Sequence, residues 1–262
     1  MAEGRLAART VWLGMNATFV MAILAAGVIR AQADDAVQAR VRLATRQMEA
    51  GRNREAEAVL EEAQKTAGQI SDGVARAELL NAWSALHVKL GQLAVAEAEL
   101  QRAREMVTTI PNAGEIRPTV LHNLAAIEMR TGRYAEALGH EREALREWEG
   151  SPSPDHAALV RGWASLASVQ YMMREAEQAR ASLDRALDLA EATFGPEHPL
   201  LADLLESDAV VLDKLKLKKD ARQARERARS IRGVMARVDE DRQSWDIREA
   251  DARQGQVCLR SK

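Results

Sequence analysis

Residues 121–145 read LHNLAAIEMRTGRYAEALGHEREAL and contain the central part of one unit of a repeat. Ala125, Ala137 and Ala144 provide small side chains, and two antiparallel helices approach each other closely only where such side chains line their contact. Gly132 lies between them, and glycine is a natural residue at the C-terminal end of a helix. The stretch therefore predicts two helices joined by a short turn.

The same arrangement of small residues recurs along the chain every 40–42 residues. Each unit has two alanines seven residues apart. The first alanines are Ala56, Ala96, Ala137, Ala179 and Ala221, and the second are Ala63, Ala103, Ala144, Ala186 and Ala228. Twelve residues before each first alanine stands another small residue: Ala44, Ser84, Ala125, Ala167 or Ala209. A helix pair of this length cannot bury its apolar face alone, so the pattern predicts stacked pairs.

The last units depart from this pattern at two places. Bulky apolar residues precede the small residue in four units, at Leu43, Trp83, Leu124 and Leu166, but the fifth unit has Asp208 there. The turn within each pair carries Gly51, Gly91 or Gly132 in the first three units, whereas Arg174 and Lys216 occupy the matching places in the last two. We therefore expect no glycine-type helix cap at those two turns.

The chain resembles tetratricopeptide-repeat (TPR) proteins of the long-repeat, kinesin-light-chain type. The stretch quoted above is similar to the TPR consensus, and Phe194–Pro199, followed by Leu201-Ala202, is similar to the segment between repeats in that subclass. The resemblance implies an all-α, right-handed superhelical solenoid of about five helix-turn-helix repeats over residues 37–232. Residues 233–262 are expected to form a helical cap and a loose tail.

The first 33 residues have a different character. Arg5 and Arg9 precede an uncharged run from Val11 to Ile29, and Ala31-Gln32-Ala33 is a small-x-small pattern. This order is typical of a secretory signal peptide cleaved before Asp34, which predicts an exported protein, periplasmic or secreted. In the alternative, residues 11–29 are retained as a transmembrane span and anchor a TPR assembly factor in the inner membrane.

No pattern of residues in the sequence indicates a catalytic site. The five histidines are scattered without metal-ligand spacing, and neither a phosphate-binding glycine loop nor a nucleophile motif occurs. The one cysteine, Cys258, excludes an internal disulfide. We therefore expect a non-enzymatic protein with no cofactor and no metal. The net charge of −2 gives no indication of nucleic-acid binding.

The resemblance places the binding groove on one face of the first helix of each repeat, where a protein or peptide partner would lie. The residues expected there are Asn81, Lys89, His122, Asn123, Arg130, Arg161, Ser165, Ser168, Tyr171 and Lys214. Amides can bond a peptide backbone, and cations can hold an acidic group. Asn123 and Arg130 lie seven residues apart, so we expect both to project, exposed, from one helix face.

The segment from Lys214 to Arg232 is strongly basic, with nine basic residues against Asp220 and Glu226. Two interpretations remain open. The segment is either a solvated terminal helix or a contact surface for anionic lipid or an acidic partner.

Overall fold

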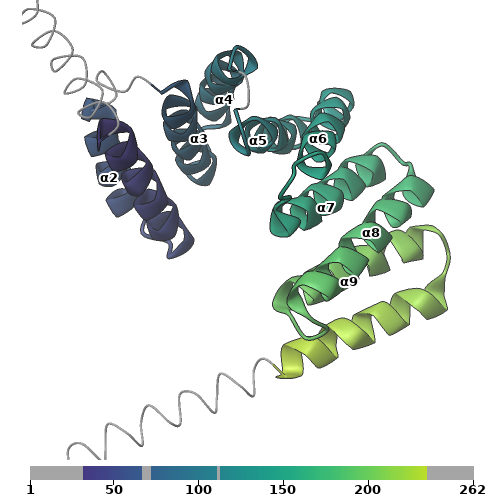
Figure 1. Cartoon of the computed structure of the whole chain (residues 1–262). Coiled ribbons are helices and arrows are strands. Elements are labelled where there is room, and N and C mark those ends of the chain that lie inside the picture. Colours follow the sequence, from purple (N-terminus) through teal and green to yellow (C-terminus); the bar gives the residue numbers. More distant parts are fainter. Residues whose placement is uncertain (1–31, 67–71, 111–112, 235–262) are drawn as a thin grey trace, which may run out of the picture. The chain divides into compact units, whose positions relative to one another are not determined.

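The computed structural model describes residues 32–66, 72–110 and 113–234, and every regular element in these ranges is an α-helix (Figure 1). The labelled helices are α2 (Asn53–Thr66), α3 (Gly73–Lys89), α4 (Leu93–Thr108), α5 (Ile116–Arg130), α6 (Tyr134–Glu149), α7 (His156–Met172), α8 (Ala176–Phe194) and α9 (Pro199–Lys214). Helical residues 32–49 precede α2, and helical residues 218–234 follow α9. The prediction of an all-α protein built from helix-turn-helix pairs is confirmed.

Parts of the sequence predictions concern residues outside these ranges. The uncharged run at 11–29 and the tail with Cys258 lie there, so signal cleavage, membrane anchoring and the loose tail stay predictions. Ala33 and Asp34, which flank the predicted cleavage site, lie at the start of helical residues 32–49. None of the helices within the described ranges combines the length and the apolar character that a membrane span needs.

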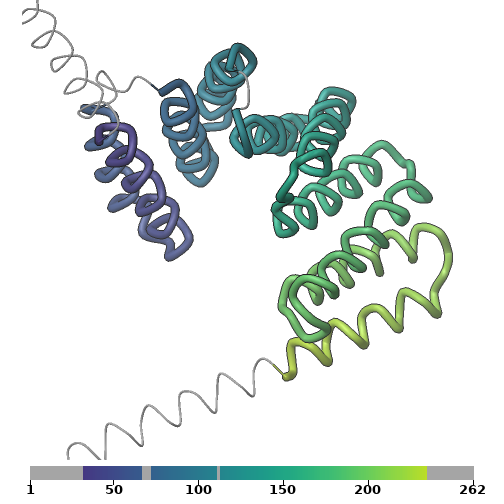
Figure 2. The backbone as a smooth tube through the Cα atoms, in the orientation of Figure 1, coloured from purple at the N-terminus to yellow at the C-terminus, as the bar shows by residue number. Residues whose placement is uncertain are grey.

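The chain divides into two compact units, Met1–Ile127 and Glu128–Lys262, and the boundary falls inside α5. In the first unit one apolar cluster lies among helical residues 32–49, α2 and α3, and a second lies among α3, α4 and α5. In the second unit α8 packs against both α7 and α9. Figure 2 shows the course of the backbone through these helices.

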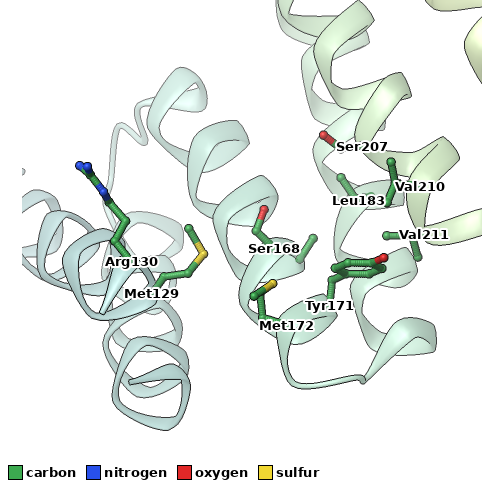
Figure 3. Close-up of a pocket in the computed structure, with 10 residues that line it drawn as sticks. Met129, Arg130, Ser168, Tyr171, Met172, Leu183, Ser207, Val210 and Val211 are labelled. Atoms are coloured by element: carbon green, nitrogen blue, oxygen red, sulfur yellow. The ribbon is translucent and has the colours of Figure 1, made fainter. Parts of the chain in front are cut away.

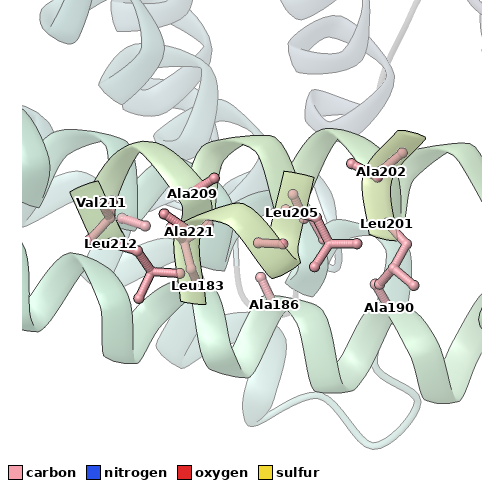
Figure 4. Close-up of a cluster of buried hydrophobic side chains, with 14 of the residues drawn as sticks. Leu183, Ala186, Ala190, Leu201, Ala202, Leu205, Ala209, Val211, Leu212 and Ala221 are labelled. Carbon is pink, nitrogen blue, oxygen red and sulfur yellow. The ribbon is translucent and has the colours of Figure 1, made fainter. Parts of the chain in front are cut away.

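The ten repeated alanines all lie in the interior of the fold. All ten have no exposed surface, and four of the five small residues twelve positions earlier are alanines at 2% exposure or less. In the second unit the alanines alternate with larger side chains such as Leu183, Leu201 and Leu212, which fill the space between helices (Figure 4). The register read from the sequence is therefore the packing register, because only a side chain as small as alanine fits where the helices cross.

The turns within the pairs correct one prediction. Gly51, Gly91 and Gly132 have φ of 73°, 78° and 80°, as a glycine helix cap requires. Arg174 and Lys216 adopt the same left-handed conformation, with φ of 68° and 65°. The amide of the next residue donates to a carbonyl five residues back in every case, as Glu175 does to Gln170 at 2.9 Å. The expectation of no glycine-type cap at these two turns was wrong, because the packing of the helix pair imposes the turn on whatever residue stands there.

A polar contact joins the two helices of three successive pairs. In each, a side chain near the end of the first helix meets one twelve residues further on. The contacts are His87 Nδ1 with Glu99 Oε2 at 2.8 Å, His140 Nδ1 with Glu128 Oε2 at 2.8 Å, and Ser182 Oγ donating to Gln170 Oε1 at 2.7 Å. All six side chains are buried or half-buried, so each pair satisfies polar atoms that water reaches poorly.

The pairs at the two ends of the described chain lack this contact. In the first pair Gln47 and Val59 hold the two positions, and Gln47 Oε1 is buried without a hydrogen-bond partner among the described residues. In the last pair Leu212 and Ala224 hold the two positions, and both are buried. The two positions that are twelve residues apart therefore hold polar side chains in the internal pairs and apolar side chains in the last pair.

Candidate functional site

A pocket of about 420 Å³ opens in the second unit between the first helices of successive pairs (Figure 3). Its lining residues come from the end of α5, from α7 and α9, and from one position of α8: Met129, Arg130, Ala167, Ser168, Tyr171, Met172, Leu183, Ser207, Val210 and Val211. Three of the predicted groove residues, Arg130, Ser168 and Tyr171, lie in this set. The other seven predicted groove residues do not line it, so the full extent of the groove stays a prediction.

The pocket is largely apolar. Met172 and Val210 line it although 49% and 47% of their surfaces are exposed, which is high for side chains of this kind. Leu183 and Val211 are buried, at 2% and 3% exposure. Figure 3 shows the thioethers of Met129 and Met172 on neighbouring helices. Methionine side chains adapt to ligands of different shape, so the pocket can accept apolar side chains of different size and shape.

Polar groups border this apolar surface. Arg130 is exposed and forms no ion pair with any part of the chain that the structure describes, so its guanidinium keeps all its donors for a ligand. The hydroxyls of Ser168 and Ser207 each donate to a carbonyl four residues back, at 3.0 Å, and keep acceptor capacity. The arrangement can bind an apolar side chain together with a neighbouring acidic group.

The sequence had not singled out Met129, Met172, Ser207 or Val210. A signal for Met172 was present, because adding the 42-residue spacing to Arg130 gives Met172 and then Lys214. The matching position therefore carries a cation, an apolar residue and a cation in three successive pairs.

Asn123 and Arg130 differ in their surroundings, although both lie on α5. Asn123 is half-buried, and its amide nitrogen donates to Asn81 Oδ1 on α3 at 2.7 Å. The expectation that both side chains are exposed was therefore wrong for Asn123. The first helices of the second and third pairs approach closely enough for the two amides to meet, and a satisfied amide bond stabilises that approach.

Ser165 makes a contact that the sequence did not suggest. Its hydroxyl donates to Glu141 Oε2 on α6 at 2.9 Å, and Glu141 has no exposed surface. A signal existed here too, because the matching positions in the first, second and fourth pairs are Leu60, Leu100 and Leu183. A carboxylate at a position where other pairs have leucine needs a donor, and Ser165 supplies one.

The remaining predicted groove residues lie outside the pocket. Lys89, Arg161 and Lys214 are exposed on α3, α7 and α9, and His122 is half-buried on α5. In the basic segment, Arg225 pairs with Asp213, Arg227 with Glu191, and Arg232 with Asp203 and Glu206. Part of this segment therefore attaches the last helix to α8 and α9, which favours the interpretation as a terminal helix.

Within the described ranges no three side chains of the histidine, cysteine, aspartate and glutamate types come close enough together to hold a metal ion. His198, next to a proline-rich break, caps α9: its Nδ1 accepts from the Leu200 amide at 3.2 Å, and its ring stacks on Phe194 with centroids 4.7 Å apart. This histidine serves the local structure of the turn.

Comparison with known proteins agrees with this architecture. A tetratricopeptide repeat family model matches residues 117–191, which run from α5 into α8. No curated protein matches the sequence. Among solved structures, BtubC (BKLC) from P. vanneervenii is 20% identical, with 81% of this chain and 92% of BtubC covered and a TM-score of 0.63.

Two further structures are similar. A putative kinesin light chain of Podosopora anserina, with nearly identical TPR-like repeats, is 17% identical over 77% of this chain and 97% of its own, with a TM-score of 0.61. A Rap protein complexed with competence and sporulation factor is 14% identical over 73% of this chain, with a TM-score of 0.64. This chain spans about half of the Rap protein, at 52%. The likeness shows that the described helices have the TPR fold.

Proposed function

We propose that this protein is a non-catalytic binding module that holds an extended segment of a partner protein against the first-helix face of its second unit. One observation carries the proposal. The exposed apolar side chains of Met172 and Val210 line the same pocket as the guanidinium of Arg130, which forms no ion pair with the described residues. Its preferred segment would place an apolar residue in the pocket and an aspartate or glutamate beside Arg130.

Relatives of the same fold support a binding role. The family match indicates no catalytic family, and the Rap structure was solved with a bound factor, competence and sporulation factor. Binding through such a pocket derives its free energy from burying the apolar side chain, and the charge pair contributes specificity and association rate. The protein would act as a scaffold that brings its partner to a cellular location or to another protein.

The cellular location of the protein is proposed from its sequence alone. Residues 1–33 have the order of a signal peptide, so the partner would be met outside the cytoplasm, in the periplasm or beyond. Mass spectrometry of the exported protein tests this, because a mature N-terminus at Asp34 is expected. An intact N-terminus in the membrane fraction would instead support the anchored alternative with residues 11–29 retained.

The pocket is tested with an array of short peptides probed with the full chain. Binding peptides should share an apolar residue next to an acidic one. Arg130→Gln should weaken binding of a selected peptide about tenfold, and Met172→Ser should do the same through loss of apolar contact. Arg229→Gln is the matched control, since it removes one exposed cation from helical residues 218–234, away from the pocket and from the first helices of the pairs.

Two results would contradict the proposal. One is an array in which bound peptides share no apolar-acidic pattern. The other is an equal loss of affinity in Arg130→Gln and Arg229→Gln, which would mean that binding responds only to total charge.

A further inference from the structure

A second pocket in the same unit, of about 410 Å³, has a different chemistry. It lies among α6, α7 and α8, and its lining includes Arg142 and Arg146 of α6 and Arg185 of α8. It uses other positions of α7 than the first pocket does: Gln170 lines it, whereas Ser168 lines the first, and these two lie roughly 200° apart around the helix. The two pockets therefore open on different faces of α7.

The three arginines converge on this pocket without acidic partners. Arg142 and Arg146 are one helical turn apart, so both side chains project from the same side of α6. The Arg185 guanidinium lies over the ring of Trp163, 4.6 Å from its centroid, which fixes its position at the pocket wall. None of the three forms an ion pair with the described residues, and Glu149 is the one acidic side chain in the lining. The lining therefore has an excess of two positive charges.

A buried amide points to the same kind of ligand. Gln170 lines the pocket although only 5% of its surface is exposed. Its Oε1 accepts the hydroxyl of Ser182 at 2.7 Å, whereas its amide nitrogen makes no hydrogen bond to any described residue. The NH₂ group of this mostly buried side chain is therefore free to donate to a ligand in the pocket.

We infer that this pocket binds a phosphate monoester. Guanidinium groups bind phosphate oxygens with paired hydrogen bonds, the excess of two charges matches a dianion, and the Gln170 amide offers a further donor. Leu145 and Trp163 also line the pocket, so it has room and apolar surface for the organic group of the ester. This site is separate from the groove proposed for the partner segment.

The test measures binding of three probes to the full chain by calorimetry: inorganic phosphate, phenyl phosphate and benzoate. Phenyl phosphate should bind most tightly, several-fold better than inorganic phosphate, because its ring contacts Leu145 and Trp163. Benzoate has the ring with a single charge, so it should bind more weakly than phenyl phosphate. Equal binding of benzoate would overturn the assignment to phosphate, and equal binding of inorganic phosphate would overturn the assignment to an ester.

Variants locate the site. Replacing two pocket arginines together, Arg142→Gln with Arg185→Gln, should reduce phenyl phosphate affinity by at least about tenfold, because two charge-assisted contacts are lost. The matched control is Arg222→Gln with Arg229→Gln, which removes the same charge from exposed positions on helical residues 218–234. The control should stay within about twofold of wild type.

A third variant tests the buried donor. Gln170→Glu keeps the acceptor for Ser182 and has a precedent in Glu128, which holds the same place in the preceding pair, but it directs a carboxylate at the pocket. It should abolish binding while circular dichroism shows an intact helical fold. Absence of saturable binding by phenyl phosphate to wild type, or equal losses in the arginine pair and its control, would overturn the inference.

Discussion

His87 of α3 and Glu99 of α4 meet with 2.8 Å between Nδ1 and Oε2, and the next pair repeats the contact with the two residue types exchanged. There Glu128 lies on the first helix and His140 on the second. The distances are the same, and so is the separation of twelve residues. The backbone of these two pairs therefore allows two complementary polar groups to meet at this level, whichever helix carries the acid.

Exchanging the second contact should be tolerated. The double variant Glu128→His with His140→Glu recreates the order found at His87 and Glu99, so its free energy of unfolding should lie within about 1 kcal/mol of wild type. Each single change places two like groups together in a poorly solvated position and should cost about 1–3 kcal/mol. Urea denaturation of the four proteins measures the coupling, and additive effects would contradict the complementarity argument.

Ionisation of the Asp208 carboxyl group should lower the free energy of unfolding as pH rises. Burial raises its pKa from 3.8 to about 6, and the nearby Asp184 carboxylate acts in the same direction. A raised folded-state pKa means that stability is greatest while the group is protonated and is lost as pH rises from about 4 through about 6. Asp208→Asn should therefore stabilise the protein by about 2–3 kcal/mol at pH 7.5, and the gain should vanish near pH 4.

The difference between wild type and Asp208→Asn, measured by urea denaturation across this pH range, isolates the contribution of this one carboxyl group. Asp184→Asn serves as a control, since it removes the neighbouring charge and should give a smaller gain in the same direction. A constant difference at all pH values would mean that Asp208 titrates normally.

The non-glycine turns store strain that a single substitution should release. Arg174 holds a φ of 68° in a conformation that costs residues with a Cβ about 1 kcal/mol. Arg174→Gly should raise the free energy of unfolding by about 0.5–1 kcal/mol, less than the full strain because glycine also makes the unfolded chain more flexible. Arg174→Ala keeps the Cβ and should bring no gain. Thermal melting of these two variants distinguishes relief of strain from loss of the arginine side chain.

Two helical glycines should respond oppositely to alanine. An added Cβ at Gly139 of α6 meets nothing within 4 Å, so Gly139→Ala should stabilise by about 0.5–1 kcal/mol through helix propensity. At Gly162 of α7 the same atom would lie 2.8 Å from Leu145 Cδ2 and 3.1 Å from Trp148 Cζ3. Gly162→Ala should therefore destabilise by about 1–2 kcal/mol despite its better propensity. Equal effects in chemical denaturation would show that α6 and α7 adjust to the methyl group.

The helix pairs and their register can be read from the amino-acid sequence. Ala137 and Ala144, and their counterparts in the other pairs, are fully buried, as small residues at the contact between two closely packed helices should be. Such contacts lie within about forty residues and recur at a constant interval, so they leave a periodic trace that a single sequence displays.

The contacts between side chains of different pairs become visible only in the folded chain. Asn81 and Asn123 are 42 residues apart and resemble ordinary groove amides in the sequence, yet they bond each other, and Glu141 is buried because Ser165 of the next helix satisfies it. Arg174 takes a glycine-like turn because the helices on either side impose it. Partners of this kind depend on how far one pair is displaced from the next, and that displacement is set by the summed packing of all side chains between them, which no local pattern records.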